Sequence, residues 1–288
     1  MIGRIGAVVL AAGASVLLGA APATSGPCHA VDGTVLVPAG RVPLGEDGEG
    51  APGETKAVAA FRIDRHEVTN RQFATFVLAT GHVTQAEREG AAPVFVMPRD
   101  PVPMNDPRGW WHMIQGADWR HPRGPDTGLA GHMDEPVVQI AFEDAAAYAR
   151  WAGATLPSVV QWERAARGTQ TGERSPESWI RASDGHATAN SWQGVFPLVD
   201  TKDDGYAGLA PVGCYDANAW GLSDMVGNAW EWTLDAAGGA GQRIIKGGSF
   251  LCAHNYCANY RPAAWQAQDH DLGASHIGFR TVRPAAAR

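Results

Sequence analysis

The sequence predicts a single α+β domain with a low content of regular secondary structure, and three observations lead to this prediction. Glycine is unusually frequent, at 35 of 288 residues, which favours turns and short elements. Capped helical segments alternate with short β-like runs. No linker rich in Pro, Ser or Gly and no run of like charges divides the chain. We therefore expect residues 24–288 to fold as one domain.

Residues 1–23 have the layout of a secretory signal peptide. One arginine precedes an apolar run at residues 5–21, and small residues follow it up to Ala23. The run is short for a bilayer span and is interrupted by glycines. The protein is therefore expected to be exported, periplasmic or secreted, with no membrane segment beyond this leader. The sequence leaves open whether the leader is cleaved.

Two strands and a helix are predicted at the start of the domain. Residues 34–38 and 58–64 read as short strands. Thr69 and Gln72 have the spacing of a capping box, and Gly81 marks the end of the helix that follows.

Residues 83–133 show no steady periodicity, although they contain Trp110, Trp111 and Trp119. So long an irregular stretch is uncommon unless it covers a functional site, but the aromatic rings also suit simple packing between loops.

The second half of the domain predicts two helices and then short strands. Helices are expected at 143–152 and 159–167, the second beginning with a capping box of Ser158 and Gln161. Gly153 and Gly168 are expected to end them. Residues 243–246 and 277–282 read as strands between Gly-rich turns.

The charge pattern argues against a nucleic-acid surface. The formal net charge is −7, and lysines and arginines form no cluster. Because phosphate binding requires such a cluster, small molecules or peptides are the expected partners.

The segment GGSFLCAHNYC carries the strongest chemical signal. Cys252 and Cys257 lie five residues apart and converge only if residues 253–255 form a bend, which Asn255 favours because Asn tolerates the left-handed conformation. A converged pair can form a disulfide or bind Cu(I), which prefers few, soft ligands. Zinc needs two further ligands, for which His254, His270 and His276 are candidates. The pairing of the other two cysteines, Cys28 and Cys214, stays open.

The chain resembles the formylglycine-generating enzyme (sulfatase-modifying factor) family over nearly the whole mature chain. The matching segments are 63–70, 135–138, 151–153, 156–157, 161–168, 189–194, 227–233, 247–261 and 277–280. Several recur in related iron-dependent and non-catalytic proteins and indicate only the fold, a variant of the C-type-lectin-like fold. The cysteine segment discriminates better, because Ser249, Cys252, Tyr256 and Cys257 match the family's copper site residue for residue.

The resemblance implies a copper-dependent oxidase. It would use O₂ to convert a cysteine in a Cys-x-Pro-x-Arg motif of unfolded sulfatase-type polypeptides to Cα-formylglycine. By resemblance, Cys252 and Cys257 are the Cu(I) ligands, Ser249 and Tyr256 orient substrate and oxygen, and Trp230 lies beside the open position at the metal. If the thiols were absent, Ser249 would be explained as a turn hydroxyl, and Tyr256 and Trp230 as aromatic residues that pack in the core.

The resemblance also implies two Ca²⁺ sites, whose oxygen donors suit this hard cation. The first would use the side chains of Asn190 and Asp204 and the carbonyls of Ser191 and Tyr206. The second maps onto Asp224, Gly227, Ala229 and Glu231.

The match weakens at residues 262–276, where His276 replaces a common Asn. This departure bears on substrate choice, because these positions line the family's peptide groove. Two other functional classes stay open. One is a binding or assembly module in which Cys252 and Cys257 form a structural disulfide, and the other is an iron-dependent maturation enzyme, for which no His-x-x-x-His spacing is present.

Overall fold

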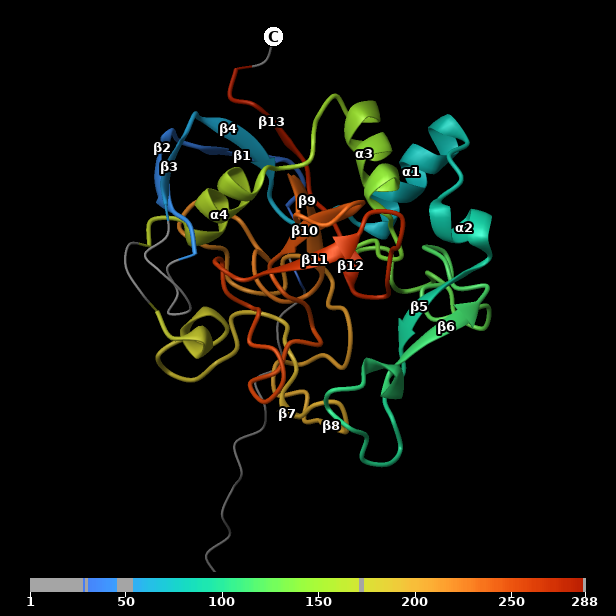
Figure 1. Cartoon of the computed structure of the whole chain (residues 1–288). Coiled ribbons are helices and arrows are strands. Elements are labelled where there is room, and N and C mark those ends of the chain that lie inside the picture. Colours follow the sequence, from blue (N-terminus) through green and yellow to red (C-terminus); the bar gives the residue numbers. More distant parts are fainter. Residues whose placement is uncertain (1–27, 29–30, 46–53, 171–173, 287–288) are drawn as a thin grey trace, which may run out of the picture.

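The computed structural model, which describes residues 28, 31–45, 54–170 and 174–286, contains a three-stranded and a four-stranded sheet (Figure 1). The first sheet is antiparallel, in the order β1-β4-β13, with β1 (Thr34–Val37), β4 (Phe61–Asp64) and β13 (Val282–Pro284). The second has the order β11-β10-β9-β12, with β9 (Trp230–Ala236), β10 (Gln242–Lys246), β11 (Trp265–Asp269) and β12 (Ile277–Gly278). β12 runs parallel to β9 and places Ile277 opposite Trp230.

The remaining strands form three two-stranded ribbons: β2 (Gly40–Pro43) with β3 (Thr55–Val58), β5 (Ala91–Phe95) with β6 (Trp111–Gln115), and β7 (Gly194–Val195) with β8 (Val199–Asp200). Two short 3₁₀ helices are η1 (Pro107–Gly109) and η2 (Pro176–Trp179).

Two of the helices, α1 and α4, begin and end where their caps predict, whereas α3 ends at Ala152 and not at the expected Gly153. α1 (Asn70–Thr80) starts at the Thr69 capping box and ends at Gly81, whose φ is +68°. α4 (Val159–Arg167) lies between the Ser158 capping box and Gly168. α3 (Phe142–Trp151) is shifted by one residue from its expected range, and α2 (Gln85–Glu89) is a single short helix.

Three expectations were wrong in detail. The strand expected at 58–64 is broken, because β3 pairs with β2 while β4 pairs with β1 and β13. The strand expected at 277–282 divides between the two sheets as β12 and β13. The 83–133 stretch is not irregular throughout, since it contains α2, β5 and β6. The strand pairings depend on partners in other segments, which local periodicity does not reveal. α2, by contrast, has a local signal in its Thr84–Glu87 capping box and in Gly90 at its end.

The main hydrophobic core lies between the helix pair α1 and α3 and the second sheet. Phe73 and Phe76 of α1 contact Tyr148 of α3 at ring-centroid distances of 6.0 and 5.6 Å. Trp232 from β9 and Phe279 join the same cluster. A smaller cluster packs Trp162 of α4 against the first sheet. Burial of these large side chains supplies most of the driving force for folding.

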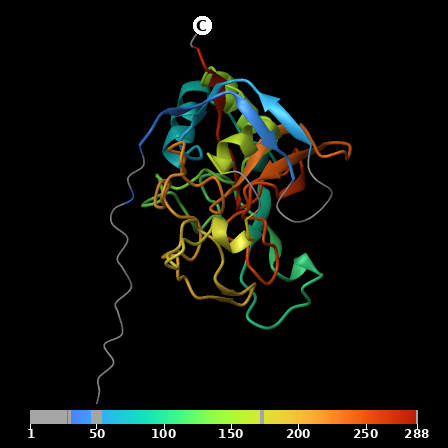
Figure 2. The ribbon, with the colours of Figure 1, turned by 90° about the vertical axis from the view of Figure 1, so that its left-hand side faces the viewer.

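Regular elements and loops occupy different regions of the molecule. Most helices and both sheets lie in the upper part of Figure 1, and the long segments between α4 and β9 form the lower part. The turned view in Figure 2 shows the same division. Within the described part of the chain, no helix has the length and apolar character that crossing a bilayer requires. The predicted leader at 1–23 lies outside the described residues.

Candidate functional site

Cys252 and Cys257 meet across a bend that follows β10. Their Sγ atoms are 3.2 Å apart and are not bonded to each other, so both are free thiols. Cys252 is buried, and Cys257 is partly exposed. The backbone N–H of Ser249 lies 3.4 Å from the Cys252 sulfur, and the Cys252 N–H donates to the Ser249 carbonyl at 2.9 Å. The structure therefore brings the two sulfurs together and leaves one of them accessible.

The bend forms, but not through a left-handed Asn255. Among the described residues, the non-glycine residues with positive φ are Gln139, Lys202, Asp224 and Asn228. Asn255 instead acts through its side chain, which accepts a hydrogen bond from the Phe196 N–H (3.2 Å) and donates one to the Phe196 carbonyl (3.3 Å). The cysteine loop is thereby attached to the chain segment around Phe196.

The two thiols differ in acidity. Burial raises the pKa of Cys252 well above its usual value, and the neighbouring Cys257 raises it further. The hydrogen bond with Cys252 lowers the pKa of Cys257, and backbone amides of Ala253 and Asn259 act in the same direction. Because the two groups interact, they titrate as a pair. We infer that the first proton to leave comes from Cys257 and that Cys252 retains its proton.

Of the other residues expected at the site, Ser249 and Tyr256 lie in the same loop as the two cysteines, and Trp230 lies on β9. Ser249 is fully buried, and its hydroxyl accepts a hydrogen bond from the Leu251 N–H at 3.2 Å. Trp230 is buried in the same hydrophobic cluster as Cys252. Tyr256 is 42% exposed, so its ring is available to a ligand beside Cys257. The Ser249 hydroxyl thus stabilises the turn in which it lies, whereas part of the Tyr256 side chain remains exposed to solvent.

An aromatic wall lies beside the thiol pair, and the sequence left open whether the stretch at 83–133 contributes to such a site. The Tyr256 ring stacks on Phe196 at 4.6 Å and meets Trp110 edge-on at 5.5 Å. Trp192 and Phe95 extend this wall behind Phe196. The irregular stretch with its tryptophans therefore does contribute to the site.

The histidines considered for zinc do not complete a four-ligand site. His254 Nδ1 lies 2.9 Å from Glu177 Oε1 at the rim of the cysteine loop. His276 is buried against Trp111, at a centroid distance of 4.6 Å, and burial lowers its pKa to about 3. Among the described residues, no three His, Cys, Asp or Glu side chains converge as a metal site. The donor set at the bend is therefore two sulfurs, which suits Cu(I) better than zinc.

Three residues of the first expected Ca²⁺ set lie together, whereas the side-chain amide of the fourth, Asn190, donates to the Gly208 carbonyl (2.7 Å) and to Asn228 Oδ1 (3.0 Å). Asp204 accepts hydrogen bonds from the Ser191 N–H (2.9 Å) and the Tyr206 N–H (3.1 Å). The side-chain amide of Gln193 donates to the Ser191 carbonyl, to the Ser191 hydroxyl (3.2 Å) and to Asp204 (2.9 Å). The Gln193 amide nitrogen thus occupies a point that several oxygen atoms face. Oxygen atoms are the ligands that Ca²⁺ prefers.

The second expected Ca²⁺ set fits less well. Glu231 accepts from Trp162 Nε1 at 2.8 Å and from two nitrogens of Arg280 at 2.7–2.9 Å. A carboxylate offers about four acceptor positions, and these contacts occupy them. Asp224 accepts from the Gly213 N–H at 2.7 Å. The assignment of Ca²⁺ to Asp224, Gly227, Ala229 and Glu231 therefore stays a prediction, and no role is derived from it.

Cys28 and Cys214, whose pairing the sequence left open, form a disulfide. The Tyr206 hydroxyl lies 3.3 Å from the Cys28 sulfur and 3.2 Å from the Cys214 sulfur. The disulfide therefore attaches Cys28 to the loop that contains the first Ca²⁺ set.

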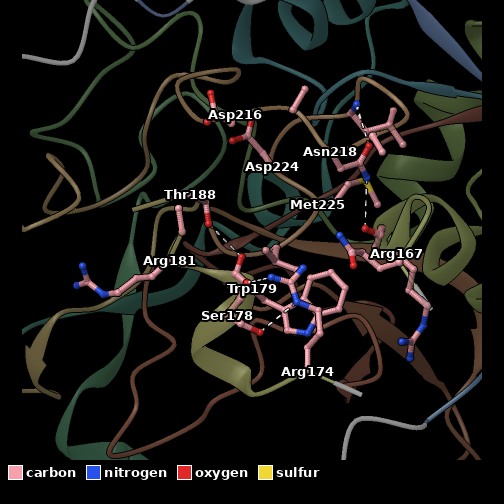
Figure 3. A pocket seen from close by; sticks show the side chains of 17 residues that line it. Arg167, Arg174, Ser178, Trp179, Arg181, Thr188, Asp216, Asn218, Asp224 and Met225 are labelled. Carbon is pink, nitrogen blue, oxygen red and sulfur yellow. Dashed lines mark hydrogen bonds between the residues drawn. The ribbon is translucent and has the colours of Figure 1, made fainter. Parts of the chain in front are cut away.

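A cavity of about 300 Å³ behind η2 is separate from the thiol pair (Figure 3). Arg174 lies against Trp179 and donates to Ser178, while the Arg181 side chain points away from them. Neither cysteine of the pair lines the cavity. Two of its buried polar atoms, Trp179 Nε1 and Asp224 Oδ1, have no hydrogen-bond partner among the described residues.

The fold and the site together define a class: a mixed α+β protein of short elements that presents a buried thiol beside an accessible one. The model of the sulfatase-modifying factor enzyme 1-like domain matches residues 21–285. The formylglycine-generating enzyme of Mycobacterium tuberculosis is 42% identical over 274 residues, covering 81% of this chain and 91% of that protein. The chain therefore belongs to the formylglycine-generating enzyme (sulfatase-modifying factor) family.

Two further similarities limit what membership implies. A Mus musculus protein named inactive C-alpha-formylglycine-generating enzyme 2 is 36% identical, covering 89% of this chain and 88% of that protein. The structure of PvdO from Pseudomonas aeruginosa has a TM-score of 0.62 at 21% identity and covers 87% of this chain and 94% of that one, which shows the fold alone. The family shares one architecture among active and inactive members, so function depends on the site.

Proposed function

We propose that this chain is an oxidoreductase that converts a cysteine of sulfatase-type polypeptides, in the motif Cys-x-Pro-x-Arg, to formylglycine. The observation that carries the proposal is the free pair of Cys252 and Cys257, with sulfurs 3.2 Å apart and one of them accessible. In the reaction, the substrate CH₂–SH group and O₂, with two electrons and two protons from a thiol reductant, give an aldehyde, hydrogen sulfide and water.

Cys252 and Cys257 would hold Cu(I). When bound, this metal supplies one-electron chemistry that a closed-shell thiol and O₂ lack by themselves. The lowered pKa of Cys257 favours the thiolate form that a Cu(I) ligand needs, and backbone hydrogen bonds around the bend stabilise its charge. The exposed face of Tyr256 and its aromatic wall would position the substrate chain beside Cys257.

Mass spectrometry tests this proposal. A peptide with the motif is incubated with the full chain, Cu(I), O₂ and a thiol reductant, and the mass change from CH₂–SH to CHO is measured. We expect conversion by the wild type and none by Cys257→Ser. An unchanged peptide, with copper shown to be bound, would refute the proposed function.

The alternative is a binding or assembly module in which Cys252 and Cys257 close into a disulfide. The inactive relative gives this alternative weight. It predicts no Cu(I) uptake after mild reduction, whereas the proposed enzyme competes for Cu(I) with a chelator at one equivalent per chain. Cys252→Ala serves as the control, because it removes one of the two sulfurs.

We further propose that the Asn190, Ser191, Asp204 and Tyr206 set binds one Ca²⁺. Burial raises the pKa of Asp204, and a cation at this carboxylate would offset that cost. Calorimetric titration should detect Ca²⁺ binding that Asp204→Asn abolishes. Equal binding by both proteins would contradict the assignment.

Export is proposed on the leader at residues 1–23 and on the Cys28–Cys214 disulfide, because disulfides persist mainly in oxidising compartments. N-terminal sequencing of the expressed protein tests it. A mature chain that starts near residue 24 is the expected result, and retention of Met1 in the cytoplasm would refute it.

A further inference from the structure

Gln193 contacts the first expected Ca²⁺ set without belonging to it. The residue directly precedes β7, in the lower part of Figure 1, and its side chain is buried. Its Nε2 atom donates to the Ser191 carbonyl, to the Ser191 hydroxyl at 3.2 Å and to Asp204 Oδ2 at 2.9 Å. One amide nitrogen therefore holds three oxygen atoms of two residues that are expected to bind a cation.

The main chain of Gln193 is held in place, whereas its terminal amide can rotate. The Gln193 carbonyl accepts from the Thr201 N–H at 2.8 Å, and its N–H donates to Asp200 Oδ1 at 3.4 Å. The torsion that ends a glutamine side chain has a broad, roughly two-fold profile, so nitrogen and oxygen exchange places at small cost. On its other side the amide oxygen accepts from the Asp204 N–H at 3.3 Å, the longest of its four side-chain contacts. Rotation therefore breaks the weakest contact on that side.

Rotation would bring Oε1 to the point that Nε2 occupies. A cation beside Nε2 would face the positive end of the amide dipole, whereas a cation beside Oε1 gains an oxygen ligand. Ca²⁺ takes roughly six to eight oxygen ligands, which is more than one from each of the four expected residues. The side-chain nitrogen of Asn190 is engaged outside the set, while the Gln193 amide contacts both Ser191 and Asp204. Gln193 is thus placed to supply a further ligand.

The surrounding charge also favours a cation over an amide. Asp204 is buried, and Oδ1 of Asp200 accepts from the N–H groups of Gln193 and Lys202. Two carboxylates therefore lie beside the Gln193 side chain or its main chain. A neutral amide can donate hydrogen bonds to such groups, but a divalent cation also compensates their charge.

Gln139, another buried glutamine, lacks this setting. Its Nε2 atom donates to the carbonyls of Pro93 at 3.1 Å and Pro122 at 2.9 Å. Both partners are neutral main-chain groups, so this amide joins two loops and carries no indication of a cation.

We propose that Gln193 is a further Ca²⁺ ligand of this chain and that its amide rotates when the cation binds. Nε2 holds the oxygens of Ser191 and Asp204 together in the absence of Ca²⁺, and Oε1 coordinates the ion in its presence. The inference rests on the proposed binding of Ca²⁺ at the first set. It explains how the same buried oxygens find a partner in both states.

Calorimetric titration of the full chain with CaCl₂ tests this role. Gln193→Met keeps the length of the side chain but removes its oxygen and nitrogen, so Ca²⁺ affinity should fall by about 10-fold. A side chain that merely blocked the set would give the opposite result, because its removal would tighten binding. Tighter or unchanged binding by Gln193→Met would therefore overturn the inference.

Gln193→Glu gives a second readout through thermal unfolding. A carboxylate at this position cannot donate to Asp204 or Ser191, so the Tm in EGTA should lie below that of the wild type. With CaCl₂ the added charge becomes a ligand, and the Tm should rise by more than it does in the wild type. A Tm of Gln193→Glu that does not respond to CaCl₂ would contradict the proposed ligation.

Gln268→Met is the matched control, because Gln268 lies on β11 and its amide donates to the Leu272 carbonyl at 2.8 Å. It should keep the wild-type affinity for Ca²⁺. A loss equal to that of Gln193→Met would show that the effect is not specific to the set and would overturn the inference.

The outcomes also separate this inference from the proposals on which it rests. Ca²⁺ binding that Asp204→Asn abolishes and Gln193→Met leaves unchanged would keep the proposed Ca²⁺ set and remove Gln193 from it. Absence of binding by both the wild type and Gln193→Glu would overturn the set and the inference together. Failure of the proposed oxidoreductase would instead appear as an unchanged mass of the substrate peptide, whatever the calcium titrations give.

Discussion

Residues around the cysteine bend divide between those that contact sulfur and those that shape the loop. The Cys252 sulfur is buried and receives the Ser249 N–H, whereas Cys257 has part of its surface exposed. Asn255 fixes the loop against Phe196 without contacting sulfur. The asymmetry in acidity between the two thiols therefore arises from their unequal burial and from the hydrogen bond that they share.

This asymmetry predicts the order of thiol alkylation in the reduced, metal-free protein. A lowered pKa means that the Cys257 thiolate forms at a lower pH than the thiolate of an ordinary free cysteine does. Iodoacetamide labelling at a series of pH values, followed by peptide mapping, should modify Cys257 first. The inflection in its labelling rate against pH should lie at a lower pH than that of a free thiol. In Cys252→Ala the inflection should move upward, because the hydrogen-bonding partner is lost. Faster labelling of Cys252 would contradict this account.

The helices show which elements local sequence can predict. α1 and α4 follow their capping boxes and glycine stops, since the Thr69 and Ser158 hydroxyls accept hydrogen bonds from backbone N–H groups three residues later. These signals lie within a few residues of each other and are visible in the chain. The predicted α+β class and low content of regular structure are also confirmed, because they too were read from signals that lie close together in the sequence.

We expect loss of one cap to destabilise the protein measurably. Ser158→Ala removes the acceptor for the Gln161 N–H and should lower the free energy of unfolding by about 1 kcal/mol, and Tm by a few degrees. Calorimetry of the variant against Ser183→Ala, an exposed turn position, measures the effect. Equal Tm values for the two variants would show that the cap contributes nothing.

At the scale of the whole molecule, the sequence predicts less, because the site depends on segments that are far apart in the chain. The cysteine motif itself was recognisable, but the aromatic wall joins Trp110, Phe196 and Tyr256, and the rim joins Glu177 to His254. The division of 277–282 between two sheets likewise depends on pairing with residues 61–63 and 230–231. Such contacts are set by packing of the whole chain, which no local pattern encodes.

The disulfide gives the last prediction, at this same scale. Cys28 and Cys214 are 186 residues apart, so their bond removes much conformational freedom from the unfolded chain. The double variant Cys28→Ser/Cys214→Ser should lose about 2–5 kcal/mol of unfolding free energy, measured by urea denaturation. A reductant should lower the wild-type midpoint toward that of the double variant and leave the variant unchanged, because the other two cysteines are already free thiols. Coincident midpoints for oxidised wild type and variant would mean that the bond constrains little. In that case, packing of Tyr206 and the loops around it would hold this part of the molecule together.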